Sequence, residues 1–344
     1  MKKILLFASF LATLLPNLLA QDQHFTQFYA APQMLNPALT GAFEGRYRVS
    51  AIYRDQWRKV LDEPIRTFGV AGDLRFDPPG QATTNDAIGL GLVFFNDKVN
   101  VVDFSTTQIA ISLAYHKALD IDGRQYLTLG VQGGLTQRNI NYSSLNFQDE
   151  FDGSTGYVLP TGEVLPANNF AYPDLNVGIN YSARFGRSGA LFAGVAMHHI
   201  VEPNVSFYRE GVEGEKLYNK VSGHLSANIP LGSTRASLLP RVLFSMQGPH
   251  AQVNVGTNFR TALGKYGSSA LHLGGWVRPV RNDDGFGLDA VVALVGFEVS
   301  NVVFGISYDI NPRALGFSQR QGAFEISVAY LGEYENEEIL CPKF

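Results

Sequence analysis

The sequence predicts an all-β protein, a transmembrane antiparallel β-barrel of about 14 strands of the outer-membrane type. Three observations predict it: an export signal at the N-terminus, period-two alternation of apolar residues, and no later apolar run reaching the ~20 residues of a transmembrane helix. A closed barrel is the other structure that satisfies every backbone polar group in lipid. Charged residues make up only 17% of the chain, which is low for a soluble domain.

Residues 1–20 have the features of a signal peptide. Lys2 and Lys3 give a positive start, residues 4–19 are mostly apolar, and Ala20 is a small residue suited to the position before a cleavage site. We therefore expect export through the inner membrane, cleavage of this peptide and localisation in the outer membrane. The single cysteine excludes an intramolecular disulfide, and the net charge of −4 gives no indication of a nucleic-acid partner.

Residues 21–45 lack clear alternation, and we expect a periplasmic N-terminal segment that can fold up into the barrel mouth. A barrel of about 14 strands would otherwise have room for water. We therefore predict that the lumen is occluded by this segment, by the loop 138–174 or by part of a partner. Gly130 and the glycine pairs at 133–134 and 274–275 predict tight curvature or close approach by such a plug.

Alternation defines the strands between residues 46 and 334. Ile109, Ile111 and Leu113, for example, alternate with Ala110 and Ser112. In a soluble β-sandwich the apolar face would be the core, whereas in a barrel it faces lipid. The signal peptide and strand lengths near ~10 residues favour the barrel. The predicted strands are 46–57, 65–76, 87–97, 104–117, 125–137, 175–185, 190–200, 217–229, 237–247, 251–260, 270–281, 287–297, 302–310 and 323–334.

The lengths of the connections indicate an orientation. The long gaps 138–174 and 201–216 follow odd-numbered strands, whereas the short gaps 186–189 and 298–301 follow even-numbered strands. Outer-membrane barrels carry long loops outside and short turns in the periplasm. We therefore expect both chain ends in the periplasm, with residues 335–344 as a periplasmic C-terminal tail.

Three stretches near the N-terminus carry a family resemblance: His-Phe-Thr-Gln-Phe-Tyr at 24–29, Leu-Asn-Pro-Ala-Leu-Thr-Gly at 35–41 and Tyr-Arg-Asp-Gln-Trp at 53–57. They resemble the opening of the PorP/SprF family, outer-membrane proteins of the type IX secretion system of Bacteroidetes. Ala31 departs from the polar residue that the family pattern places before Pro32. The candidate residues for a partner-binding or structural motif are Phe25, Gln27, Tyr29, Asn36, Pro37, Gly41, Tyr53, Arg54, Gln56 and Trp57.

The resemblance implies a non-enzymatic, accessory barrel in protein secretion. Its expected partners are type IX secretion components, secreted cargo with a C-terminal signal domain, or both, with outer-membrane lipid around the barrel. Family members support adhesin export, surface anchoring or gliding motility. The alternative function is a diffusion porin or a hydrophobic-solute channel. A third class, an outer-membrane hydrolase, requires a Ser, His and Asp cluster that the spacing does not provide.

The N-terminal motif has two interpretations. In the structural one, Gln27, Asn36 and Arg54 satisfy one another or backbone groups where the segment meets the first strand, as buried polar groups require. In the functional one, the segment contacts a periplasmic or secreted partner. The sequence leaves both interpretations open.

Metal binding and catalysis are not expected. The acidic stretch 149–153 lacks the register of an EF-hand, which favours a solvated loop over a calcium site. His198 and His199 point to opposite faces of a strand, so they cannot easily share a metal ion. Together with His224 and His272 they form no nucleophile–base set. We therefore expect no catalytic residue, no metal and no cofactor.

Overall fold

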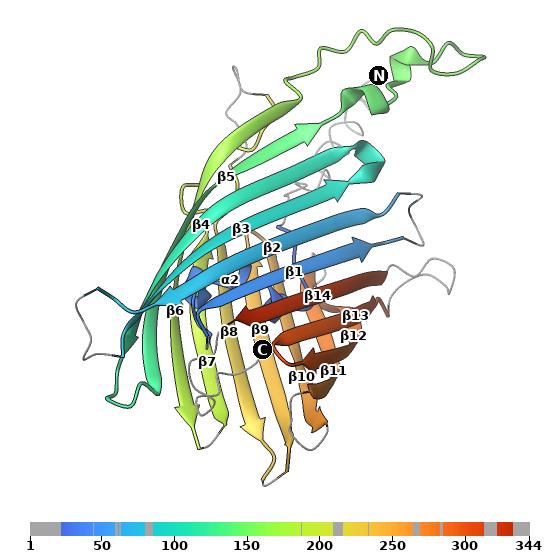
Figure 1. Cartoon of the computed structure of the whole chain (residues 1–344). Helices are drawn as coiled ribbons and strands as arrows, with labels where there is room; N and C mark the ends of the chain where they lie inside the picture. Colours follow the sequence, from blue (N-terminus) through green and yellow to red (C-terminus); the bar gives the residue numbers. More distant parts are fainter. Residues whose placement is uncertain are drawn as a thin grey trace.

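The computed structural model describes residues 22–332, apart from residues 44, 59–60, 62, 80–84, 187, 209–215, 233, 264–268, 283–284 and 313–321. Fourteen antiparallel strands close into a barrel, in which β1 (Tyr47–Gln56) pairs with β14 (Gly322–Gly332) (Figure 1). The predicted all-β barrel of about 14 strands is confirmed. The expected signal peptide, residues 1–20, and C-terminal tail, residues 335–344, lie outside the described residues.

The remaining strands run up and down around the barrel in chain order. Their bounds are β2 (Ile65–Phe76), β3 (Ala87–Val99), β4 (Phe104–Ala118), β5 (Gln125–Ile140), β6 (Asn169–Phe185), β7 (Gly189–His198), β8 (Lys220–Pro230), β9 (Ala236–Gln247), β10 (His250–Leu263), β11 (Ser269–Asn282), β12 (Gly285–Val299) and β13 (Val302–Ile310). β6 begins earlier than the predicted residue 175, because the buried Phe170 and Tyr172 continue its inward-facing side.

The two faces of the strands differ as the alternation predicts. Ile111 is 59% exposed, whereas its neighbour Ser112 is fully buried. The same pattern recurs in β5, where Leu129 and Val131 are exposed and Thr128 is buried. A β-sandwich would bury the apolar face, so this exposed apolar belt contradicts the sandwich and is typical of a surface that faces lipid.

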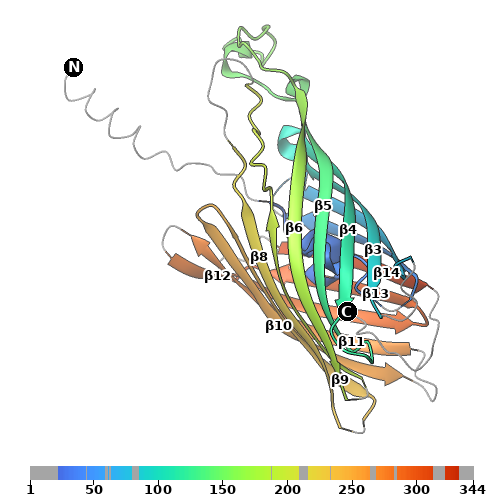
Figure 2. The same ribbon diagram turned by 90° about the vertical axis from the view of Figure 1, so that its left-hand side faces the viewer.

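The two ends of the barrel also differ. The long connections 141–168 and 199–219 join strands at one end, termed here the long-loop end, and short connections such as 186–188 lie at the short-turn end. The β5–β6 hairpin projects beyond the other strands at the long-loop end (Figures 1 and 2). The 3-10 helices of the connections are η3 (Asn100–Val102), η4 (Tyr142–Ser144) and η5 (Gln148–Glu150). Because barrels carry their long loops outside, we propose that the long-loop end faces the exterior.

Residues 22–43 lie inside the barrel and are termed the plug (Figure 2). The segment expected on the periplasmic side, from where it can fold up into the barrel mouth, lies in the lumen, and it is the first of the three predicted sources of occlusion. It folds into three short turns, η1 (Phe28–Ala30), α2 (Pro32–Leu35) and η2 (Pro37–Leu39). Proline begins both α2 and η2, a position where its missing N–H removes no helical hydrogen bond. Among the described residues, no helix is long and apolar enough to cross a membrane.

Candidate functional site: the plugged lumen

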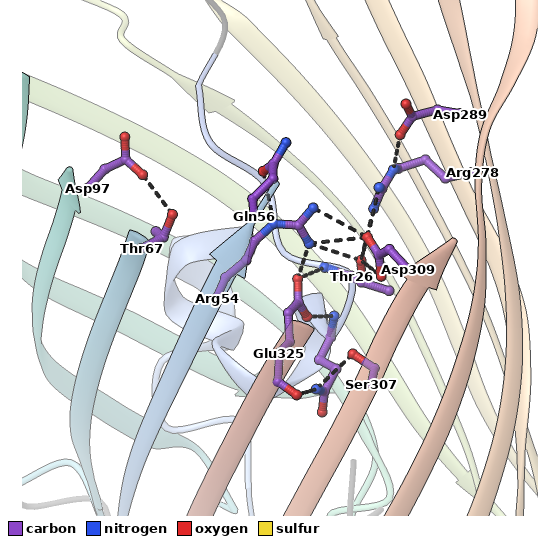
Figure 3. Close-up of polar contacts among 11 residues, drawn as sticks. Thr26, Arg54, Gln56, Thr67, Asp97, Arg278, Asp289, Ser307, Asp309 and Glu325 are labelled. Atoms are coloured by element: carbon purple, nitrogen blue, oxygen red, sulfur yellow. Dashed lines mark hydrogen bonds and ion pairs between the residues drawn. The ribbon is translucent and has the colours of Figure 1, made fainter. Parts of the chain in front are cut away.

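Glu325 of β14 holds the first turn of the plug. Its side chain is fully buried, and its two carboxylate oxygens accept hydrogen bonds from the backbone N–H groups of Thr26 (2.8 Å) and Gln27 (2.9 Å). Arg54 of β1 donates through Nη1 to the same carboxylate (Figure 3). N–H groups at the start of a turn have no partner within it, so Glu325 acts as their cap.

A second buried cluster surrounds the hydroxyl of Thr26. This hydroxyl donates to Asp309 (2.8 Å) and accepts from Arg278 Nη1 (2.8 Å). Asp309 lies between two guanidinium groups, accepting from Arg54 Nη1 (3.2 Å) and from Arg278 Nη2 (2.8 Å) (Figure 3). Arg278 also donates to Asp289 (2.8 Å). Buried charges are tolerated only when they are paired, and here the pairs join β1, β11, β12 and β13 around one plug residue.

The side chain of Gln27 fixes the plug against β13 and β14. Its Nε2 donates to Ser307 Oγ (3.0 Å), and its Oε1 accepts from Ser327 Oγ (2.8 Å). A methyl group at Gly305 would overlap Oε1 of Gln27. The wall therefore has room for this amide only because residue 305 has no side chain.

Aromatic side chains form the centre of the plug. Phe28 meets the Trp276 indole edge-on, with ring centroids 5.7 Å apart, and Tyr29 stacks on the same indole at 5.8 Å. Trp276 Nε1 donates to Asn258 Oδ1 (3.0 Å), and Asn258 Nδ2 donates to the Tyr29 hydroxyl (3.3 Å). Each such aromatic pair adds roughly 0.5–1.5 kcal/mol beyond the area it buries. The polar ends of both rings are thus bonded.

Asn36 reaches the opposite wall of the barrel. Its Nδ2 donates to the carbonyl oxygens of Ile179 in β6 (3.1 Å) and Val195 in β7 (3.4 Å). Its Oδ1 accepts from the N–H of Ala38 (2.8 Å) and so caps η2. A methyl group at Gly178 would overlap Asn36 Oδ1. The plug therefore spans the lumen from β13 and β14 to the strands half-way round the barrel.

The glycines singled out in the sequence behave differently from one another. A methyl group at Gly130 would overlap the backbone nitrogen of Ala38, so close approach by the plug is confirmed there. At Gly274 a methyl group would instead overlap the side chain of Asn258. Gly133 and Gly275 have open space beside them, so the prediction that the plug approaches closely is wrong for these two glycines.

Gly41 closes the short-turn end of the plug. Its φ of +72° lies in the left-handed region, which glycine adopts without strain. Its N–H donates to Asp73 Oδ2 (2.7 Å), and its carbonyl oxygen accepts from Arg75 (2.8 Å). Asp73 is ion-paired with Arg48 (2.6 Å), which also donates to the carbonyl oxygen of Leu39 (3.1 Å). The plug thus ends on a second buried ion pair.

Asp22 fastens the other end of the plug near the long-loop end. Its carboxylate lies 2.7 Å from His199 Nε2, just beyond β7, and 3.2 Å from Lys220 Nζ. His199 Nδ1 lies 3.0 Å from Asp174. Burial would lower the pKa of His199, but Asp22 and Asp174 raise it to about 9, so the imidazole is protonated at neutral pH. Burial would likewise raise the pKa of Asp22, but Lys220 and His199 hold it well below its usual value.

Two cavities lie between the plug and the long-loop end. The first has a volume of about 270 Å³ and is lined by Asp22 and His24 of the plug together with Arg54, Gln56 and Trp57. The second has a volume of about 150 Å³ and shares Asp22 and His24 with the first. The two cavities together are termed the vestibule.

The structure places most of the predicted motif residues in the lumen. Gln27, Asn36 and Arg54 do not bond to one another; each bonds to the barrel wall, and Arg54 also bonds to Thr26 of the plug. Gln56 accepts from Arg54 (3.3 Å) and, like Trp57, lines the vestibule. The buried motif residues of the plug are Phe25, Gln27, Asn36, Pro37 and Gly41, with Tyr29 partly buried.

Tyr53 and Trp57 differ from the other motif residues. Tyr53 belongs to the outward-facing side of β1, where its hydroxyl donates to Asp55 (3.3 Å). Trp57 has a φ of 63°, which is strained for a residue with a side chain, and its N–H donates to the carbonyl oxygen of Gly322 (2.8 Å). Trp57 therefore holds an unusual turn at the rim of the vestibule.

Sequence reasoning missed the partners that the strands supply to the plug. Glu325, Asp309, Arg278 and Asp73 are not among the candidate motif residues, although the stretches that contain the first three resemble the family. The available signal was a charged residue on the small and polar face of a predicted strand, as for Glu325 between Phe324 and Ile326. In a lumen filled with water such a charge would be solvated. Its burial can therefore be predicted only when the position of the plug is known.

The histidines and the acidic stretch have local structural roles. Asp152 accepts hydrogen bonds from the Thr155 hydroxyl and from the N–H groups of Ser154 and Thr155, which hold its pKa below the usual range. His272 lies 2.9 Å from Glu298, and His224 lies 3.1 Å from Asn180 Oδ1. Among the described residues, no group of three or more His, Cys, Asp or Glu side chains is placed to hold a metal ion.

A closed barrel with an apolar belt and a plugged lumen defines an outer-membrane β-barrel protein. The chain belongs to the family of type IX secretion system membrane proteins PorP/SprF, whose family model matches residues 17–330. Fold and family together support an outer-membrane location and a role in type IX secretion. The family resemblance seen in the N-terminal motifs is thus confirmed.

Solved structures of other barrels are similar in fold. A deltaS2 mutant of the monoaromatic hydrocarbon channel TodX has 10% sequence identity and a TM-score of 0.53, over 89% of this chain and 94% of that one. A FadL homologue of Pseudomonas aeruginosa has 11% identity and a TM-score of 0.48, over 88% of this chain and 94% of that one. Among curated proteins, none matches the chain. At such low identity the likeness to TodX concerns the fold alone.

Proposed function

We propose that this protein binds other type IX secretion components, or the C-terminal signal domain of a secreted surface protein, at the vestibule. The observation that carries the proposal is the position of the motif residues. Arg54, Gln56 and Trp57 line the cavity of about 270 Å³, directly over a lumen that the plug fills. A lumen that is filled by the chain itself supports a binding role rather than free diffusion of solutes.

The size and charge of the vestibule suit a protein partner. A cavity of about 270 Å³ accommodates a few side chains but not a threaded domain. Its wall presents Lys220 and Arg281 beside Asp289, so it offers both charge signs to a polar segment. The plug forms the inner boundary of the vestibule and is held by buried ion pairs. It is therefore preorganised, which reduces the entropy lost on binding. A role without catalysis, supporting adhesin export, surface anchoring or gliding, follows from this proposal.

Co-purification from native membranes in mild detergent tests the proposal. We expect type IX components or surface proteins with C-terminal signal domains to accompany the full chain. Because interface tryptophans commonly contribute 2 kcal/mol or more, Trp57→Ala should reduce partner recovery by about tenfold or more. Ile121→Ala, at an exposed position in the connection between β4 and β5, is the matched control and should retain the partner. Equal recovery from both variants, or no secretion component in any preparation, would contradict the proposal.

A second candidate function is passage of apolar solutes. The observation that favours it is a small cavity of about 60 Å³ in the short-turn half, lined by apolar side chains such as Phe28, Leu35, Phe192 and Leu239. The structural neighbour TodX is described as a monoaromatic hydrocarbon channel. Uptake of toluene into vesicles containing the purified protein, without any co-purifying partner, would favour this function over partner binding.

A further inference from the structure

Arg241 of β9 is a buried cation without a partner in the described part of the chain. Only 3% of the residue is exposed, and it forms neither an ion pair nor a hydrogen bond with the described residues. The Tyr29 ring of the plug lies against it, with the ring centroid 4.0 Å from the guanidinium carbon. The Nη1 atom is fully buried and unsatisfied.

Other arginines of the lumen are compensated within the chain. Arg48 is paired with Asp73, Arg54 with Glu325, and Arg278 with Asp309. A ring face compensates a desolvated cation by only about 2 kcal/mol, whereas burying an unpaired charge costs considerably more. The guanidinium of Arg241 therefore requires an anion that the described chain does not supply.

Arg241 lies on the cavity of about 60 Å³ in the short-turn half. Nδ1 of His224 and Oδ1 of Asn228, which also belong to its wall, have no hydrogen-bond partner among the described residues. His224 is bonded through its other nitrogen to Asn180 (3.1 Å), so its ring is held in place. Arg48 and Ser226 also line the cavity, and most of the remaining wall is apolar, including Phe192 and Leu239. Of the two arginines on this wall, Arg48 is paired with Asp73, whereas Arg241 has no carboxylate partner among the described residues. The wall therefore matches a ligand with one negative charge and an apolar remainder.

We propose that this cavity binds the carboxylate of an aliphatic monocarboxylic acid on Arg241. One water molecule needs ~10–15 Å³ of space for its centre, so about 60 Å³ measured in this way admits a carboxylate group and a short apolar remainder. The planar guanidinium matches the two oxygens of a carboxylate. A phosphate would carry more negative charge than Arg241 alone compensates. The site is independent of partner binding at the vestibule.

The pairing of β8 with β9 is interrupted beside the cavity. The β8–β9 ladder pairs Ser226 with Arg241 and resumes only at Ile229 and Leu238, so the ladder lapses beside Ala227 and Asn228. The residue opposite Ala227 is Pro240, which has no N–H to donate. Ala227 and Asn228 line the cavity from inside. The acid therefore has two possible sources: a short acid from water, or a fatty acid from the membrane that enters where the β8–β9 pairing is interrupted.

Titration of the full chain in lipid nanodiscs with propionate and octanoate tests the site. Trp276 stacks on Tyr29, which lies over Arg241, so Trp276 fluorescence in a Trp57→Phe background reports on the cavity. Calorimetry on the unaltered chain provides an independent measure. We expect saturable binding of a carboxylate. Octanoate binding at least about tenfold tighter than propionate would indicate the membrane source, since each buried CH₂ contributes ~0.8 kcal/mol; equal affinities would indicate the aqueous source.

Two arginine variants separate the site from general charge effects. Arg241→Gln should weaken carboxylate binding by about tenfold or more, because a charged hydrogen bond contributes ~1.5–3 kcal/mol. Arg260→Gln removes the same charge from an arginine that is already paired with Glu298 (2.6 Å), and should leave binding unchanged. If Arg241→Gln fails to fold, Arg241→Lys retains the charge and should bind more weakly than the unaltered chain. Absence of saturable binding to the unaltered chain, or equal binding by all variants, would overturn the proposal.

Discussion

At the scale of single residues, the plug is held by buried, desolvated charged groups. Glu325 receives two backbone N–H groups of the plug and one guanidinium of the wall, and Asp309 receives two guanidinium groups and a hydroxyl. Each charge is acceptable only while its partners are present. Removing one carboxylate should therefore cost more than the interaction itself contributes, because it leaves Arg54 or Arg278 buried with one carboxylate instead of two.

Replacing Glu325 with alanine should destabilise the protein by about 3–5 kcal/mol, the usual effect of breaking a buried ion pair. Urea titrations in lipid vesicles measure this change as a shift of the unfolding midpoint. The matched control is Glu63→Ala at an exposed position, which should change stability by about 0.5 kcal/mol or less. Equal effects of the two substitutions would show that Glu325 does not hold the plug.

The ion pair between Asp22 and His199 should weaken at alkaline pH. The folded-state pKa of His199 is raised to about 9 against an unfolded value near 6.5, so its stabilisation is complete below about pH 6.5 and is lost as pH rises through 9. Hydrogen-exchange protection of the backbone N–H groups at residues 22–27 should fall by about tenfold between pH 6 and pH 10. The His199→Gln variant should show low protection at both pH values. A strong pH dependence that persists in this variant would assign the effect to another group.

At the scale of elements, the alternation of apolar and polar residues along each strand is a local property, and it can therefore be predicted from the sequence. The lipid-facing and lumen-facing sides follow from it, as at Ile111 and Ser112. The position of the plug is not local, since the bond between Thr26 and Glu325 joins residues 299 positions apart. The motif at 24–41 can be recognised in the sequence. The strand residues that bind it cannot, because any polar residue on a lumen face could form these hydrogen bonds.

A charge on the lipid face should be costly, and a charge in the vestibule should not. Ile111→Arg should destabilise the barrel by about 2–4 kcal/mol if it lies near the bilayer midplane, because the guanidinium would face hydrocarbon. Gln252→Arg places the same group at the wall of the vestibule, where water is available, and should cost about 1 kcal/mol or less. Folding titrations in vesicles compare the two. Equal penalties would mean that the assignment of the faces is wrong.

At the scale of the whole molecule, the plug connects opposite sides of the barrel. Thr26 and Gln27 bond to β11, β13 and β14, whereas Asn36 bonds to β6 and β7 half-way round the ring. Gly41 and Asp22 secure its two ends at the short-turn and long-loop ends. A barrel of this size would otherwise hold water, so the plug converts a potential channel into a solid support for the vestibule.

Planar-bilayer recording tests most directly whether the chain closes its own barrel. The intact protein should show little steady conductance, because residues 22–43 span the lumen between buried partners on both walls. A variant that lacks residues 22–43 should conduct ions steadily through the vacated lumen. Large and stable conductance from the intact protein, equal to that of the deletion variant, would contradict the plug and with it the proposed binding function.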